Sequence, residues 1–287
     1  MAKVTNAYRI GGTKPVIICD FTPPRGTGSE YLDNARKLDV DFISVAYNPG
    51  KAVRVDSAML AYTIKERTGK DVLFNLATRD MNRLALESHL LGASLLGLEN
   101  LLILGGDPFS QQDLKQVRDV SDFTSTELIK AVVDLNQCLD FRGRNLREPT
   151  NLCIGGAIDL SRGINTEAKL THRKAQAGAH YFVTQPIFDT MKKDKFEEAY
   201  MSVAGKLLVQ PVFYGLHILV NGGVIFSPVP EEVRRNLEAG RDGVDIALEM
   251  WEQFREVGID AVYLVPPILK GGERDYEAAR RFLALVN

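Results

Sequence analysis

The strongest constraint on the fold is a succession of eight short apolar segments that alternate with longer segments of helical periodicity. Each short segment is almost wholly apolar, as in parallel strands whose two faces are both covered. Eight β-then-α units in succession predict an α/β fold of the (βα)8 TIM-barrel type, and a doubly wound open sheet is the alternative. The expected strands are Val16 to Asp20, Phe42 to Ala46, Val72 to Leu76, Leu101 to Leu104, Leu152 to Gly155, Tyr181 to Thr184, Val209 to Phe213 and Ala261 to Val265.

The length of 287 residues fits one barrel, because α/β barrels run to roughly 250 residues as a single unit. No repeat, low-complexity tract or interdomain linker divides the chain, so we expect one barrel domain over residues 1–287. Two connections, at about 108–150 and 214–231, are longer than the others and follow the fourth and seventh expected strands. Insertions at these places are expected on the catalytic rim, and loops without a function are the alternative.

Charge and cysteine content exclude several classes of function. The chain has 35 basic and 37 acidic residues, which leaves no electrostatic footprint for nucleic acid or an anionic membrane. No apolar run reaches the roughly 18 residues of a membrane span, and the first residues lack the apolar core of a signal peptide. Three cysteines without CxxC spacing and four histidines without ligand spacing predict neither disulfides nor a metal site. We therefore expect a cytoplasmic protein of enzyme size.

Barrel enzymes carry their chemistry on the residues that follow the strands. Asp20 and Asp107 should face one mouth from the first and fourth strands, and a desolvated carboxyl group there can donate a proton. Gln185 offers a donor and an acceptor to the edge of a heterocycle. Paired glycines after the fourth and fifth strands leave space for a broad, flat ligand. The structural alternatives are capping aspartates, an amide that fixes a loop, and glycines that serve tight turns.

Other chemistries lack the residues that they need. No GxSxG or GxGxxG motif follows an expected strand, which argues against a hydrolase and a Rossmann fold. No lysine stands at a strand end inside the barrel, which argues against a Schiff-base aldolase. The residues alone predict a rim with two acids, one amide and room for flat rings.

The order and spacing of short sequences along nearly the whole chain resemble the methylenetetrahydrofolate reductase family. The similarity runs from about Val16 to the C-terminal helix, although no single piece is decisive. The matching pieces are Asp20-Phe21-Thr22-Pro23-Pro24-Arg25, Ser44-Val45-Ala46-Tyr47, Asn75 to Arg83 with Leu90-Leu91-Gly92-Ala93, Gly106-Asp107-Pro108, Lys174 to Ala179, Thr184-Gln185-Pro186-Ile187-Phe188-Asp189, Gly215, Arg241-Asp242-Gly243 and Tyr263-Leu264-Val265-Pro266-Pro267.

This resemblance implies a barrel that binds FAD, takes a hydride from NAD(P)H and reduces 5,10-methylenetetrahydrofolate to 5-methyltetrahydrofolate, in one-carbon metabolism and methionine biosynthesis. Asp20 falls where the family has a glutamate that acts as general acid on N10 of the folate. Asp107 matches an aspartate near the flavin and the pterin, so both acids are implied to be catalytic. The implied substrate-binding residues are Gln185, Phe188 and Tyr263. The implied cofactor-binding residues are Tyr47, Asn75, Ala77, Gly105, Gly106, Asp107, Ala157, Arg173 and Lys174, of which Arg173 and Lys174 suit the phosphates.

Three departures from the family pattern concern the acid, the flavin wall and the lid. Asp20 is one methylene shorter than glutamate, which is about 1.5 Å of reach. Gly156, Ala157 and Asp159 stand where aromatic and histidine side chains often lie against the flavin, and the segment after Gly215 is short. The alternatives are a reductase that uses a soluble hydride donor without flavin, a folate-binding and partner-dependent subunit with little activity alone, and an unrelated barrel lyase. Apolar outer helices also predict a homo-oligomer or a partner subunit.

Overall fold

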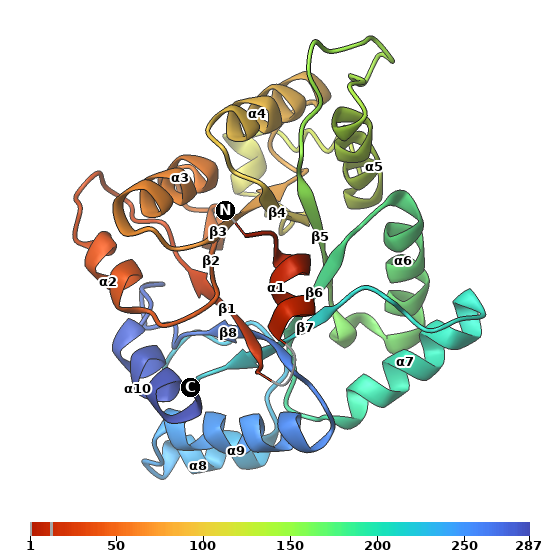
Figure 1. The fold of residues 1–287 in the computed structure, drawn as a ribbon. Helices are drawn as coiled ribbons and strands as arrows, with labels where there is room; N and C mark the ends of the chain where they lie inside the picture. The colour runs from red at the N-terminus through yellow and green to blue at the C-terminus, as the bar shows by residue number, and fades with distance from the viewer. Residues whose placement is uncertain (1, 12–13) are drawn as a thin grey trace.

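The computed structural model describes residues 2–11 and 14–287. Eight parallel strands pair in chain order, and β1 pairs with both β2 and β8, so the sheet is a closed barrel. Helices form a ring around it (Figure 1). The (βα)8 barrel predicted from the alternation of apolar and helical segments is confirmed, and the open sheet is excluded.

The elements have the following bounds. The strands are β1 (Val16–Phe21), β2 (Phe42–Val45), β3 (Val72–Ala77), β4 (Asn100–Leu104), β5 (Cys153–Ile158), β6 (Tyr181–Pro186), β7 (Val212–His217) and β8 (Ala261–Val265). The helices are α1 (Val4–Gly11), α2 (Tyr31–Lys37), α3 (Ser57–Thr68), α4 (Arg83–Leu95), α5 (Ser125–Asn136), α6 (Ile164–Ala177), α7 (Met191–Ala204), α8 (Glu231–Glu238), α9 (Gly243–Glu256) and α10 (Tyr276–Val286). Short 3-10 turns are η1 (Pro49–Lys51), η2 (Asp113–Lys115) and η3 (Leu160–Arg162).

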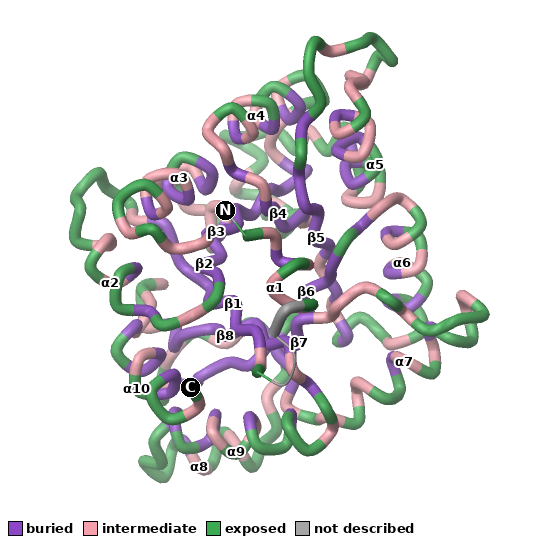
Figure 2. The backbone as a smooth tube through the Cα atoms, viewed as in Figure 1, coloured by how far each residue is buried: buried purple, intermediate pink, exposed green. Residues whose placement is uncertain are grey.

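The strands are buried on both faces, which explains their apolar composition (Figure 2). In β1, Val16 and Ile18 pack inside the barrel, whereas Ile17 and Cys19 pack against the helices. Successive side chains of a strand point to opposite faces, so the residues two positions further along share a face. Asp20 therefore continues the inward row of β1.

Helix α1, which sequence analysis did not predict, closes the amino end of the barrel (Figure 1). Val4 is fully buried, and its backbone N–H donates to Oδ1 of Asn100 at 3.1 Å. Tyr8 packs edge-on against Phe213, with 6.5 Å between the ring centroids. The opposite end, formed by the carboxyl ends of the strands and the loops that follow them, is called the mouth below.

Two strands lie later in the chain than expected. β7 begins at Val212 because the apolar run that starts at Val209 precedes the sheet: Val209 is 84% exposed, and Pro211 cannot donate to a ladder. β5 runs from Cys153 to Ile158, so Gly155 lies within a strand and not after one. The shift in β7 makes His217 its last residue.

The long connection between β4 and β5 has two parts, which lie at opposite ends of the barrel. Residues 105–124 follow β4 and belong to the mouth, whereas residues 137–152 follow α5 and lead into the amino end of β5. The backbone N–H of Phe141 donates to Oε2 of Glu87 on α4 at 2.9 Å, so this second part packs on the outer helices. Only the first part of the insertion expected at 108–150 is therefore on the rim.

Across the described residues, we find no helix with the length and apolar character needed to span a membrane.

Candidate active site at the mouth of the barrel

Asp20 lies at the mouth, near the carboxyl end of β1, and is only 6% exposed. Its Oδ2 accepts two hydrogen bonds from Arg274, from Nε at 2.9 Å and from Nη2 at 2.8 Å. Its Oδ1 accepts a hydrogen bond from the hydroxyl of Tyr263 at 3.0 Å. Asp20 is the acceptor in all three bonds, which is the pattern of a carboxylate in a buried, forked ion pair.

A chain of polar groups continues from Asp20 across four neighbouring strands. The Tyr263 hydroxyl on β8 also lies 3.1 Å from Oγ of Ser44 on β2. The Ser44 hydroxyl in turn donates a hydrogen bond to Oδ1 of Asn75 on β3, at 3.1 Å. Burial, the charge of Asp20 and the hydrogen bond to it raise the pKa of Tyr263, so its hydroxyl keeps the proton that it donates. The resemblance implies that Asn75 contacts a cofactor, but here its oxygen accepts the hydrogen bond from Ser44.

Arg274, which was not among the expected site residues, reaches Asp20 from the connection after β8. This connection is a small hairpin, in which Ile268 and Arg274 form an antiparallel bridge. Its turn is made by Gly271 and Gly272, whose φ angles of 110° and 88° favour glycine. Although burial opposes the charge, the carboxylate of Asp20 raises the pKa of Arg274. The only signal in the sequence is a basic residue after two turn-forming glycines.

A second ion pair, which is partly buried, lies on the β3 and β4 side of the mouth. Nε of Arg79 lies 2.6 Å from Oδ1 of Asp80, and its Nη1 donates to the backbone oxygen of Asp107 at 2.7 Å. Its guanidinium carbon lies 4.2 Å from the centre of the Phe109 ring. Burial and the neighbouring Asp80 raise the pKa of Tyr47. Asp107 itself is exposed, whereas a proton donor was expected to be buried at this position.

The two glycine pairs have different roles. An added Cβ would meet nothing within 4 Å at Gly105, and Gly106 adopts a φ of 84°, so the pair on the β4 side leaves open space. A Cβ at Gly155 would lie 2.4 Å from the Tyr181 ring, and one at Gly156 would lie 3.0 Å from the Phe182 ring. Aromatic side chains of β6 fill the space beside β5, so the expectation of ligand space is wrong for this pair.

The expected substrate residues differ in accessibility. Gln185 is exposed at the end of β6, whereas Tyr263 is buried in the polar chain described above. Phe188 is half-buried and packs against the apolar cluster of Leu219, Leu237 and Ile246. Gln185 borders a pocket lined by Asp159, Leu160, Ser161, Pro186, Ile187, Lys192, Phe226, Ser227 and Pro228.

Arg173 and Lys174 do not form the phosphate site that the resemblance implies. Both lie near the end of α6, whose carboxyl end points away from the mouth. Lys174 is 4% exposed, and its ammonium group donates to the backbone oxygen of Ala157. Burial lowers its pKa to about 8. Arg173 is exposed, so neither cation is presented to a ligand at the mouth. Ala77 is buried in β3, and Ala157 is half-buried in β5.

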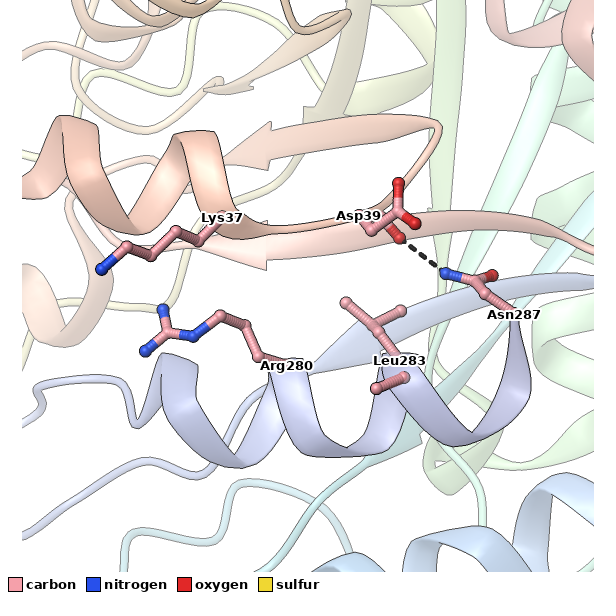
Figure 3. Close-up of a pocket in the computed structure, with 6 residues that line it drawn as sticks. Lys37, Asp39, Arg280, Leu283 and Asn287 are labelled. Atoms are coloured by element: carbon pink, nitrogen blue, oxygen red, sulfur yellow. Dashed lines mark hydrogen bonds between the residues drawn. The ribbon is translucent and has the colours of Figure 1, made fainter.

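A larger pocket of about 360 Å³ lies at the opposite end of the barrel, between the carboxyl ends of α2 and α10 (Figure 3). Nδ2 of Asn287 donates to the backbone oxygen of Asp39 at 2.9 Å there. The remaining lining residues are Lys37, Arg280, Leu283 and Ala284. We place the active site at the mouth despite the size of this pocket, because the buried acid and its polar chain lie there.

Comparison with known proteins gives two findings. The family model described as methylenetetrahydrofolate reductase matches residues 6–221, which include β1 to β7 with Asp20, Asp107 and Gln185. The barrel is also similar to a solved structure described as "Uncharacterized protein from Clostridium thermocellum binds two copies of 5-methyl-5,6,7,8-tetrahydrofolic acid", with a TM-score of 0.69 and 14% identity over 97% of each chain. This second likeness supports the fold alone. Since the family match covers well over half of its length, the chain belongs to the methylenetetrahydrofolate reductase family.

Proposed function

We propose that this protein reduces 5,10-methylenetetrahydrofolate to 5-methyltetrahydrofolate, with Asp20 as the acid at the mouth. The observation that carries the proposal is the buried Asp20 in a member of this family, joined to Tyr263 and the polar chain behind it. Ring opening of the substrate requires a proton on N10, and the resulting iminium carbon then accepts a hydride. The Clostridium thermocellum barrel, whose title names a bound reduced folate, supports this ligand class.

Proton donation by Asp20 requires that Arg274 first leave it. The forked ion pair stabilises the carboxylate, which has no proton to give. Without the guanidinium, the Asp20 carboxylate would be buried without its counter-ion. We propose that bound folate displaces Arg274, which the short glycine hairpin at residues 268–274 carries. The acid is then generated only when substrate is present.

We propose that the hydride comes from NAD(P)H. The residues at the mouth match only part of what FAD would need as the hydride carrier. The open backbone at Gly105 and Gly106 accommodates a flat ring, as the resemblance implies. Arg173 and Lys174 offer no phosphate site, and aromatic rings fill the space beside Gly155. These residues do not fit the whole cofactor. Direct transfer from a reduced nicotinamide is the second candidate, favoured by the same observations.

The proposal is tested by NAD(P)H oxidation and 5-methyltetrahydrofolate formation, with purified protein assayed before and after incubation with FAD. An absorption spectrum shows whether the purified protein holds a flavin and so separates the two hydride routes. Asp20→Asn should abolish folate reduction and leave any flavin reduction by NAD(P)H largely intact. Asp39→Asn, in the pocket at the other end of the barrel, is the control and should retain both activities.

Two outcomes count against the proposal. Equal loss of both half-reactions in Asp20→Asn would make Asp20 a structural residue. Reduced-folate binding without turnover by any donor would instead favour the folate-binding, partner-dependent subunit.

A further inference from the structure

His217, the last residue of β7, is a buried imidazole at the mouth. It is 4% exposed, and neither Nδ1 nor Nε2 has a hydrogen-bond partner among the described residues. Phe213 on the same strand packs inside the barrel, and the two-residue period places His217 on the same inward face. A buried polar group without a partner destabilises the protein, so its presence requires a reason.

The surroundings of His217 keep it uncharged. The ring of Phe226, from the segment after β7, lies over it with 5.2 Å between centroids and 34° between planes. Burial, with a smaller contribution from the positive charge of Arg274, lowers the pKa of His217 to about 3. At neutral pH the imidazole therefore has one N–H donor and one acceptor nitrogen.

The other histidines do not share this arrangement. Nδ1 of His180 accepts a hydrogen bond from the backbone N–H of Ile154 at 2.9 Å, which gives this imidazole a structural role. His89 and His172 lie in the outer helices and each have one buried nitrogen without a partner. Only at His217, among the described histidines, are both nitrogens left unpaired.

Neighbouring loops of the mouth add further unpaired atoms. Oγ1 of Thr22, just after β1, and Oγ of Ser227, beside Phe226, are buried without partners within the described chain. Phe226 is itself 47% exposed, so the ring that covers His217 lies at the surface of the protein. Unpaired donors and acceptors on the loops of the mouth are what a polar ligand would satisfy.

We propose that His217 binds the heterocycle of the reduced folate, with a hydrogen bond from one imidazole nitrogen to the ring edge after Phe226 moves aside. This inference rests on the proposed function and adds a binding residue to it. The pterin edge carries both N–H donors and nitrogen or oxygen acceptors, so a neutral imidazole finds a complement on it. The bound pterin would form the hydrogen bond that the His217 imidazole lacks in the protein alone.

The test compares His217→Leu with His172→Leu, which removes an imidazole that also has an unpaired nitrogen but lies on an outer helix. Thermal unfolding and 5-methyltetrahydrofolate affinity by calorimetry are measured for both. His217→Leu should unfold no earlier than wild type, since an unsatisfied polar group is removed, but should bind about tenfold or more weakly. His172→Leu should bind as wild type does.

A second measurement does not depend on a leucine at the site. In ¹⁵N-labelled wild-type protein, the ring nitrogen signals of His217 should shift on addition of 5-methyltetrahydrofolate, with assignment by His217→Gln. Unchanged affinity in His217→Leu, or unmoved ring signals at saturating ligand, would overturn the role of His217 and leave the proposed function standing. A wild-type protein that binds no reduced folate would overturn both.

Discussion

Removal of the Arg274 guanidinium should destabilise the protein strongly, because it leaves Asp20 buried without its counter-ion. Both side chains are 8% exposed, and one carboxylate oxygen accepts both hydrogen bonds. Loss of one partner from a buried pair costs about 3–5 kcal/mol, whereas exposed pairs contribute roughly 0–1 kcal/mol. Tyr263 still donates to Asp20 after the change. We therefore expect Arg274→Met to lower the free energy of unfolding by about 3 kcal/mol.

A double-mutant cycle separates this pairing from other effects of the substitutions. Asp20→Asn keeps the shape of the side chain and removes its charge, and the double variant has neither charge. The double variant should lose less stability than the sum of the two single variants, by roughly 2 kcal/mol. Urea unfolding of all four proteins at neutral pH measures the difference.

Arg280→Met is the matched control, because Arg280 pairs with the exposed Glu277 on α10. Its effect should be much smaller than that of Arg274→Met. The buried pair would be refuted if the losses of unfolding free energy in the two single variants simply added up in the double variant. It would also be refuted if Arg274→Met and Arg280→Met lost equal stability.

Three further predictions concern the glycines, a buried lysine and the second acid. Gly155→Ala should destabilise the protein by roughly 1–3 kcal/mol in thermal unfolding, because the added Cβ overlaps the Tyr181 ring. Gly105→Ala is the control and should leave the stability unchanged. Equal effects of the two substitutions would contradict this prediction. The pKa of Lys174 is lowered to about 8, so the unfolded chain binds more protons between pH 8 and about 10 and stability rises with pH there. Lys174→Met should lose this rise in urea unfolding, and an unchanged rise would argue against the buried lysine. Asp107→Asn should weaken turnover and shift the potential of any bound flavin, which a redox titration checks.

The barrel could be predicted because buried parallel strands give short apolar runs that stand out from helical periodicity. The ends of the strands were harder to place. The run from Val209 is apolar but exposed, and Gly155 contributes little hydrophobicity although it lies within β5. Helix α1 was missed because its apolar residues, such as Val4 and Tyr8, are few and close to the start of the chain.

The candidate site was predictable only where a strand carries its residues to the mouth. Asp20 and Gln185 follow from their strands, whereas Arg274 lies 254 positions from its partner and depends on the path of a hairpin. The motif match places Lys174 on its helix, but it does not show that its ammonium group donates to the backbone oxygen of Ala157. The two unpaired nitrogens of His217 depend on every neighbouring element, which the sequence does not specify.

The most direct test of the central claim is a crystal structure of the protein with bound 5-methyltetrahydrofolate. The pterin should lie at the mouth, within hydrogen-bonding distance of Asp20 and Gln185, and Arg274 should no longer contact Oδ2 of Asp20. A folate bound only in the pocket between α2 and α10, or a pterin at the mouth above an intact Asp20–Arg274 pair, would contradict the account.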